Sequence, residues 1–263
     1  GLSWSDDGHI DFTRDGCDPR PAGPLGAGKG ELYTGPITIS TNARIVARVV
    51  DVGRVQRGTP QSTPWSAPAA ATFVVERPHL VITEVMHHPE SPPPFLPLAA
   101  SDFEFVELLN PMERAVSLLG FHLKGSIRYR FTASGGRTQL GPGERLVVVS
   151  NQEAFAMRYP GVTAIAGDYE GGLDGEVRRV ELRGPMEELV FEAGYADRSN
   201  PMAEGVGFSM VPKAESALGT KADGGSDWRL SANVGGSPGR ADPEPQSTRA
   251  LLLNEVFVGE SNF

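Results

Sequence analysis

The sequence predicts an all-β protein built from two β-sandwich modules in tandem, with one short helix near residues 151–159. Many short β-branched and apolar runs are separated by turn-forming residues, a pattern typical of turn-rich β proteins. The 32 glycines and 22 prolines are a larger share than the roughly 12% of an average protein. Because 39% of the residues are hydrophobic, the composition favours a turn-rich β protein over a disordered chain, and 263 residues suffice for two cores.

The charge and cysteine content exclude several classes of protein. The net charge is −9 and the pI about 5.1, so we expect no nucleic-acid partner. The only cysteine, Cys17, excludes an intrachain disulfide. No apolar run approaches the roughly 18 residues of a membrane helix, so we expect no membrane insertion. The sequence starts at Gly1 with no signal-peptide pattern, and we expect a fragment of a longer polypeptide.

Residues 1–78 are expected to form the first module. Thr41-Asn42 separates two β-branched runs and predicts a hairpin between them. Pro78 ends the last strand of the module. No strand pattern precedes the first run, so we expect this module to be truncated at its N-terminus. The predicted strands are His9–Thr13, Pro36–Ser40, Ala43–Asp51 and Ala69–Glu76.

Residues 79–240 are expected to form the second module, which begins with two strands around a proline-rich loop at 89–97. In the first of these strands, strict alternation places Leu80, Ile82 and Glu84 on one face. The opposite face receives Val81, Thr83 and Val85. The predicted strands are Leu80–Met86, Asp102–Asn110, Val116–Leu119, Phe121–Lys124, Ile127–Phe131, Arg145–Ser150, Val177–Arg183 and Glu188–Tyr195.

The only good helix pattern covers Asn151–Tyr159. Ser150 is the expected N-cap and Glu153 follows at the spacing of a capping box, while Pro160-Gly161 ends the helix. After the last predicted strand, residues 196–239 are rich in glycine and serine and have few strand signals. The apolar residues Phe208–Val211 and Trp228 are expected to anchor this tail to the sandwich.

The end of the chain repeats the beginning of the second module. A polar linker is predicted at 241–250, and Leu251–Phe257 then matches the run that starts at Leu80, with Glu255 in the place of Glu84. We therefore predict that residues 251–263 are the first strand of a second, truncated copy.

The first module resembles the immunoglobulin-like module at the C-terminus of bacterial chitobiases and β-hexosaminidases. The matching runs are FTRDGCDPR, LYTGPITIS, ARIVARVVD and PWSAPAAATFVV, which lie between about residues 8 and 76. Modules of that kind also occur in large surface proteins.

The second module resembles the bacterial lamin tail domain, which is also an immunoglobulin-like sandwich. The match covers about residues 79–240 in the family's order and includes ITEVM, FEFVELLN, LGPGERLVVVSNQEAF and DWRLSANVGGSPG. The two resemblances together imply two immunoglobulin-like β-sandwich modules with an interaction role. The lamin tail family has no shared catalytic residues, so the resemblance implies no enzyme.

Three glutamates are the candidate catalytic residues. Glu84 and Glu107 are expected on neighbouring strands, where a carboxylate pair of the glycosidase kind would need to lie. Glu104 and Glu107 differ by an odd number of residues, so one strand directs them to opposite faces. Because an unpaired buried carboxylate is costly, the favoured interpretation is structural: each glutamate accepts hydrogen bonds from the backbone or a cation.

Two stretches are candidate metal sites. His87 and His88, with His79 and Glu90 nearby, lack the spacing of a common zinc motif, and the favoured interpretation is a solvated loop. The acidic run Asp168–Glu176 lacks the alternating oxygen positions of an EF-hand, although a sandwich loop can bind calcium without them. We predict no metal ligands and no cofactor.

Two further stretches are similar to known ligand sites. Gly23–Gly30 (GPLGAGKG) is close to a phosphate-binding loop, but no strand precedes it and Gly30 replaces the required Ser or Thr. Trp4, Trp65 and Trp228 are candidates for a sugar-stacking surface, although three tryptophans are also ordinary core residues.

The sequence therefore predicts a non-catalytic protein, not an enzyme. We expect structural or adhesive protein-interaction modules of a large bacterial extracellular or cell-surface protein. The partners would be an unidentified protein or glycan and the neighbouring domains of the same polypeptide. The alternative is a carbohydrate-binding accessory region of a secreted glycan-active protein.

Overall fold

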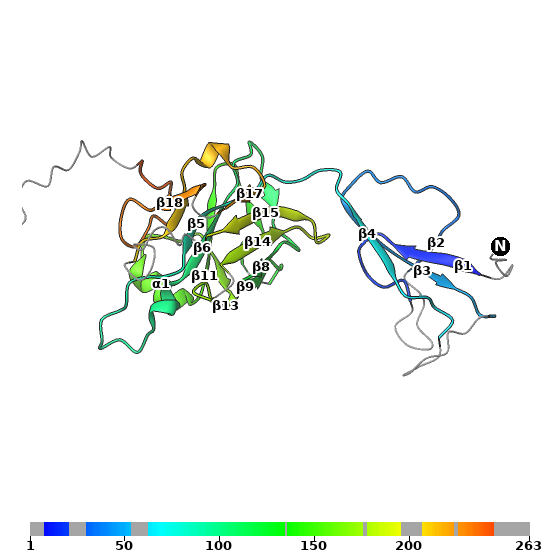
Figure 1. Ribbon diagram of the computed structural model, residues 1–263, viewed down its shortest axis with the longest axis horizontal. Coiled ribbons are helices and arrows are strands. Elements are labelled where there is room, and N and C mark those ends of the chain that lie inside the picture. The colour runs from blue at the N-terminus through cyan, green and yellow to red at the C-terminus, as the bar shows by residue number, and fades with distance from the viewer. Residues whose placement is uncertain are drawn as a thin grey trace, which may run out of the picture.

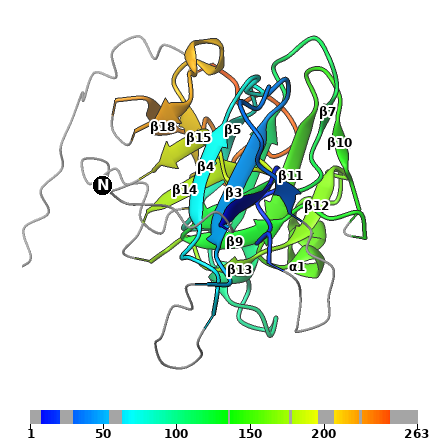
Figure 2. The same ribbon diagram turned by 90° about the vertical axis from the view of Figure 1, so that its right-hand side faces the viewer.

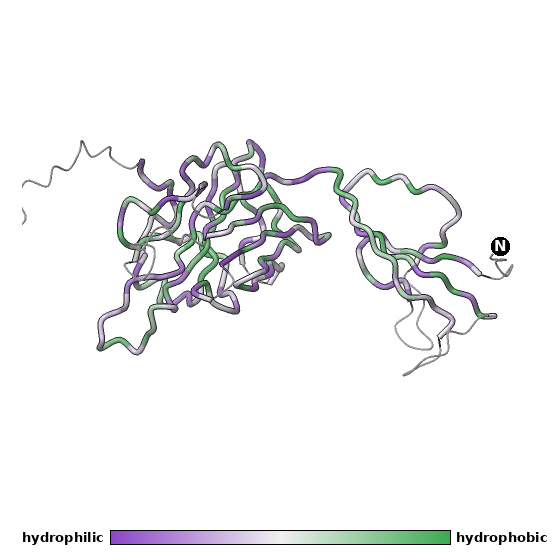
Figure 3. The backbone as a smooth tube through the Cα atoms, viewed as in Figure 1, coloured by the Kyte–Doolittle hydropathy of each residue, from purple (hydrophilic) through white to green (hydrophobic). Residues whose placement is uncertain are grey.

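The chain forms two β modules joined by a short extended segment (Figure 1). The computed structural model describes residues 8–20, 30–53, 63–134, 136–175, 178–195, 207–223 and 226–244. Its elements confirm the all-β class and the tandem of β modules, and the described residues contain one α-helix. In Figure 3 the segment between the modules is hydrophilic, as expected from its sequence Glu76-Arg77-Pro78-His79.

The described part of the first module is one antiparallel sheet with the strand order β2-β1-β3-β4. In the end-on view of Figure 2 its strands lie in front of the second module. The strand bounds are His9–Thr13 (β1), Glu31–Leu32 (β2), Ala43–Val50 (β3) and Ala69–Phe73 (β4).

One face of this sheet is apolar along three strands. The paired register places Ile10 opposite Val49, and Ile45 opposite Ala71. Phe73 continues this face at one end of β4 and is 45% exposed. Such a face is what one layer of a sandwich presents to the other layer. The described residues of this module contain one layer.

The predicted hairpin around Thr41-Asn42 is wrong, because residues 36–40 form no strand. Pro36 cannot donate a backbone hydrogen bond, and β3 pairs instead with β1 and β4. The Asn42 side chain instead binds two other segments. Its Oδ1 accepts from the backbone N–H groups of Val75 and Glu76, both at 2.9 Å, and its Nδ2 donates to Glu188 of the second module at 3.1 Å. Asn42 therefore fixes the chain where the modules meet.

The described residues of the second module form two six-stranded sheets and a small pair, β10-β7. The first sheet has the order β12-β11-β6-β5-β16-β18 and the second β13-β9-β8-β14-β15-β17. The first sheet comprises Val81–Met86 (β5), Phe105–Leu109 (β6), Arg145–Val149 (β11), Ile165–Asp168 (β12), Met210–Pro212 (β16) and Trp228–Leu230 (β18). The second comprises His122–Gly125 (β8), Ile127–Arg130 (β9), Glu170–Gly171 (β13), Arg179–Arg183 (β14), Leu189–Gly194 (β15) and Lys221–Ala222 (β17). The small pair is Val116–Ser117 (β7) and Gln139–Leu140 (β10).

The main core lies between the two sheets and receives alternate side chains from both, which is the arrangement of a β-sandwich. Ile82 and Val106 come from the first sheet, while Leu123 and Leu182 come from the second. Figure 3 shows hydrophobic stretches along the strands in the middle of this module. A smaller cluster lies on the outer face of the first sheet, where Phe155 of the helix packs on strand residues.

A β-bulge in β5 corrects the predicted faces of that strand. The register with β6 shifts between Ile82 and Glu84, so that Ile82 and Val85 both reach the main core. One extra residue, Thr83, accounts for the shift. As a result Glu84 lies opposite Glu107 instead of sharing a face with Ile82.

The predicted helix is present, but Ser150 does not cap it. Helix α1 covers Gln152–Arg158, and the Asn151 side chain caps it by accepting from the N–H groups of Glu153 and Ala154, both at 3.1 Å. The Ser150 hydroxyl donates to the carbonyl of Ser101 at 2.6 Å. The cap therefore comes one residue later than predicted, since Ser150 directly follows β11 and its backbone N–H donates to the carbonyl of Glu104 at 3.0 Å.

Two other segments differ from the prediction. Residues 102–104 are not strand, because a 3₁₀ helix covers Ala100–Phe103 before β6 begins. The tail carries more structure than its sequence suggests, since β16, β17 and β18 all lie in it. The predicted anchor Trp228 is 1% exposed.

The contacts of this module extend into the predicted linker, where Asp242 pairs with Arg229. Residues 251–263, the predicted second copy, lie outside the described residues.

Candidate functional site

The structure brings together two of the three candidate glutamates on the outer face of the first six-stranded sheet. Glu84 of β5 and Glu107 of β6 are directly opposite in the antiparallel register. Their exposed fractions are 1% and 0%. This buried pair of carboxyl groups on adjacent strands is the candidate site.

Glu84 is held by the chain's tail. Its Oε1 accepts from the Ser209 hydroxyl at 2.5 Å and from the backbone N–H of Ser237 at 2.9 Å. Burial raises the pKa of Glu84 to about 8, and the negative charge of Glu107 acts in the same direction. Glu84 is therefore largely protonated at neutral pH.

Glu107 has a cation beside it. Its Oε1 accepts from Arg145 and from Thr83, both at 2.7 Å, and its Oε2 accepts from the backbone N–H of Gly239 at 2.6 Å. Burial raises the pKa of Glu107, and the guanidinium of Arg145 opposes that effect. Arg145 also pairs with Glu215 at 2.6 Å. Of the two glutamates, Glu107 is the one with a cationic partner, and this partner offsets part of the cost of its burial.

The closing segment, residues 236–242, covers both glutamates. Gly236 has φ +73°, and a Cβ added there would lie 2.0 Å from Oε1 of Glu84, so only glycine fits. Asp242 extends the network: its Oδ1 accepts from the Ser237 hydroxyl at 3.0 Å, and its carboxylate also pairs with Arg229. The two backbone donors, one to each glutamate, attach this segment to the sheet.

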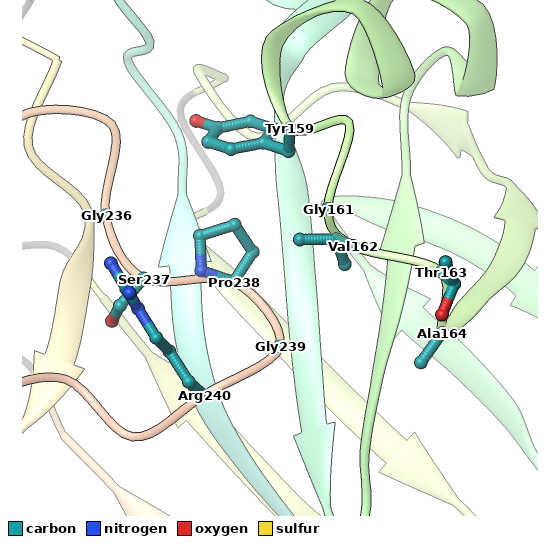
Figure 4. Close-up of a pocket in the computed structure, with 10 residues that line it drawn as sticks. All are labelled: Tyr159, Gly161, Val162, Thr163, Ala164, Gly236, Ser237, Pro238, Gly239 and Arg240. Atoms are coloured by element: carbon teal, nitrogen blue, oxygen red, sulfur yellow. The ribbon is translucent and has the colours of Figure 1, made fainter.

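A groove of about 420 Å³ lies beside the closing segment. Figure 4 shows the Tyr159 ring over Pro238 with Val162 beside them, and the chain from Gly236 to Arg240 along one side. The Tyr159 hydroxyl donates to the carbonyl of Gly235 at 2.7 Å. The groove is lined by residues 159, 161–164 and 236–240, so neither glutamate lines it.

This arrangement is poorly suited to general acid–base chemistry. A glycosidase pair needs one carboxyl group against the leaving oxygen and the other against the sugar or a water. Here each carboxyl group is buried and engaged by neighbouring hydroxyl, guanidinium or backbone donors. What the site does instead is bind its own chain, joining a bulged strand to the closing segment.

Glu104 is separate from the pair, as its sequence spacing predicts. It follows the 3₁₀ helix, and its Oε2 accepts from the Tyr169 hydroxyl at 2.9 Å and the N–H of Leu173 at 3.0 Å. Burial raises the pKa of Glu104 to about 7. The Tyr195 hydroxyl donates to the carbonyl of Leu173 at 2.8 Å, so Glu104 and Tyr195 hold the same loop from two sides.

The predicted solvated loop is wrong for His87, which follows β5 and is 1% exposed. The rings of His87 and His88 lie 4.7 Å apart by their centroids, and His87 packs against Tyr195 at 5.3 Å. The backbone N–H of His79 lies 3.3 Å from the Met112 sulfur, and the Glu90 carbonyl accepts from Arg158. Within the described parts of the chain, no three His, Cys, Asp or Glu side chains are grouped as metal ligands.

The acidic residues of the run 168–176 contact different partners. Asp168 accepts from the backbone N–H of Gln152 at 2.9 Å, and Glu170 lies 3.7 Å from Arg128. The last residue of this run, Glu176, lies outside the described residues.

The two remaining motifs place no site in the described structure. Residues 23–29 of the predicted glycine-rich loop and Trp4 lie outside it. Trp228 lies in the core between the sheets, whereas Trp65 belongs to the first module. The buried Trp228 cannot belong to a sugar-stacking surface. Of the described helices, none has the length and apolar character needed to cross a membrane.

Sequence reasoning missed the groups that bind the two glutamates. Arg145, Ser209, Ser237 and Gly239 are far from both of them in sequence and carry no motif spacing. One signal was available: the run Gly235-Gly236-Ser237-Pro238-Gly239 is unusually rich in residues that allow a close backbone approach.

Comparisons with known proteins do not assign this chain to a family. No protein-family model and no curated protein matches the sequence. Among solved structures, the chain is similar to a DUF4876 family protein from Bacteroides thetaiotaomicron VPI-5482, with 9% sequence identity and a TM-score of 0.38. The alignment covers 85% of this chain and 90% of that chain.

Proposed function

We propose that this chain forms non-catalytic structural and adhesive modules of a larger bacterial extracellular or cell-surface protein. The observation that carries the proposal is the engagement of Glu84 and Glu107, the best catalytic candidates, by the closing segment. Each receives a backbone N–H from that segment, at 2.9 Å and 2.6 Å. Residues that bind the closing segment in this way stabilise the folded state.

The resemblances of residues 8–76 and 79–240 to chitobiase-type and lamin-tail modules support the same proposal. Both families supply immunoglobulin-like units to longer polypeptides. The joint between the modules also fits a role as a spacer, because Asn42 and Thr72 of the first module bond to Glu188 and Met186 of the second, at 3.1 Å and 3.2 Å. Side-chain bonds of this kind limit the freedom of one module relative to the next.

The experiment compares wild type with Glu107→Gln in two assays, urea unfolding and hydrolysis of a panel of chromogenic glycosides. We expect Glu107→Gln to lower the urea midpoint and hydrolysis to stay at the buffer background for both proteins. Hydrolysis by wild type that disappears in Glu107→Gln, with an unchanged urea midpoint, would refute the proposal.

A further inference from the structure

The outer face of the second six-stranded sheet contains a groove where two strands separate. Strands β8 and β9 are paired at His122–Arg130 and Leu123–Tyr129. Beyond this point each strand pairs with its other neighbour, Lys124 with Glu181 on β14 and Arg128 with Glu170 on β13. The groove at this fork has a volume of about 400 Å³. Sites for small ligands are about 300–1,000 Å³, so the groove has a suitable size.

Three strong cations line the groove, namely Lys124, Arg128 and Arg130. Lys124 pairs with Glu187 at 2.5 Å. Arg130 is exposed, forms no ion pair within the described structure, and has its Nη1 3.5 Å from the carbonyl oxygen of Gly120. An arginine that lines a groove without a carboxylate partner can offer its planar donors to an anion.

The ion pair between Arg128 and Glu170, also in the groove, is weak enough for a ligand to replace one partner. Arg128 lies 3.7 Å from Glu170, and the side chains are 75% and 81% exposed. Exposed pairs of this kind are worth about 0–1 kcal/mol, so a carboxylate from a ligand can replace Glu170 at little cost. Arg128 and Arg130 are two residues apart on one strand and thus about 7 Å apart along it, on the same face.

The groove also contains acceptors. Asp168 and Glu170 line it together with the cations, and Asp168 uses Oδ1 to accept from the Gln152 N–H. A ligand that matches this lining needs an anionic group for the arginines and hydroxyl donors for the two carboxylates. An acidic peptide without hydroxyl groups supplies the first and not the second. A nucleic acid would meet these carboxylates on a chain of net charge −9.

We propose that this groove binds a carboxylated glycan, with a uronate carboxylate on Arg128 and Arg130 and sugar hydroxyls on Asp168 and Glu170. The inference rests on the proposed adhesive role and names its partner. Recognition would use charge and hydrogen bonds in this groove, and not the tryptophans that the sequence suggested.

The test is titration of the ¹⁵N-labelled full chain with an oligogalacturonide, followed by amide chemical shifts and calorimetry. We expect shifts concentrated at residues 122–130 and 168–170, and an affinity that falls as salt rises. Arg130→Gln should weaken binding about tenfold or more, because it removes a charge-assisted contact. The matched control is Arg179→Gln, since Arg179 is exposed on the same sheet but does not line the groove. This variant should bind like wild type.

Two comparison ligands define the chemical class. The same oligosaccharide with its carboxyl groups reduced to alcohols should bind at least about tenfold more weakly, and so should a polyglutamate peptide of equal charge. The inference is overturned if the oligogalacturonide produces no shifts, if Arg179→Gln weakens binding as much as Arg130→Gln, or if either comparison ligand binds equally well. None of these outcomes affects the proposed structural role, which depends on the unfolding of Glu107→Gln.

Discussion

The two outer faces of the second module place charge in opposite ways. On the first six-stranded sheet, a helix and the closing segment cover the surface, and Glu84, Glu107 and Asp242 are 1%, 0% and (as a side chain) 4% exposed. On the second sheet, Arg128 and Glu170 are 75% and 81% exposed. An ionisable group that is buried needs hydrogen-bond partners for its polar atoms, whereas an exposed charge is free to exchange partners. The first face is therefore suited to holding the fold and the second to meeting a ligand.

The largest expected effect on stability comes from adding a methyl group at Gly236, next to the Glu84 carboxyl group. In Gly236→Ala the new Cβ would lie 2.0 Å from Glu84 Oε1, at φ +73°. We expect a loss of about 4 kcal/mol in the free energy of unfolding, from backbone strain and overpacking together. Gly161→Ala is the control, because its Cβ meets nothing within 4 Å. Urea unfolding of both variants is the measurement, and equal midpoints would contradict the account.

Removing the charge of Glu107 should have the next largest effect. Glu107→Gln leaves Arg145, whose side chain is 10% exposed, without its buried counter-ion, and we expect a loss of about 3 kcal/mol. Glu215→Gln removes the other partner of Arg145, which is 29% exposed, and should cost under about 1 kcal/mol. Chemical unfolding of the two variants gives the comparison. A larger loss for Glu215→Gln would mean that the buried pair is not what holds Arg145.

The pH dependence of stability should reveal the proton on Glu84. Its folded pKa of about 8 exceeds the value of 4.5 for an unperturbed group, so between these pH values the folded state holds a proton that the unfolded state has lost. Stability from this group is complete below pH 4.5 and falls as pH rises towards 8. Glu84→Gln stays neutral, so its decline from about pH 5 to about pH 8 should be smaller than that of wild type by on the order of 3 kcal/mol. Parallel stability curves for the two proteins would show that Glu84 is ionised in the folded state.

The smallest effect on stability is expected on the open face. Arg128→Gln removes one member of a pair separated by 3.7 Å at high exposure, and the free energy of unfolding should change by less than about 0.5 kcal/mol. Thermal melting and the glycan titration on the same sample separate folding from binding. A marked loss of stability would place Arg128 among the residues that hold the fold.

Much of the strand pattern is predictable from sequence, because alternation and turn residues are local signals. The strand His9–Thr13 has its predicted bounds, and the apolar run from Arg145 to Val149 is a strand as expected. The bulge at Thr83 could not be predicted, since an extra residue appears only when the partner strand is known. For the same reason the predicted face of Glu84 is wrong.

The sequence predicts the two glutamates of the candidate site but not the groups that bind them. The neighbouring positions of Glu84 and Glu107 followed from two strands expected to pair, and the structural interpretation followed from the cost of burying a carboxylate. Their donors Ser237 and Gly239 lie 153 and 132 residues away from them in sequence. Contacts at such separation depend on the path of the whole tail, which had no strand pattern strong enough to place it.

The most direct test of this account is native-state hydrogen exchange at the amides of Ser237 and Gly239. Because these N–H groups donate to buried Glu84 and Glu107, we expect both to exchange only through an opening whose free energy approaches that of global unfolding. Protection of the Gly239 amide should drop in Glu107→Gln. Exchange of both amides at the rate of exposed loop positions in wild type would contradict the claim that the two glutamates hold the closing segment.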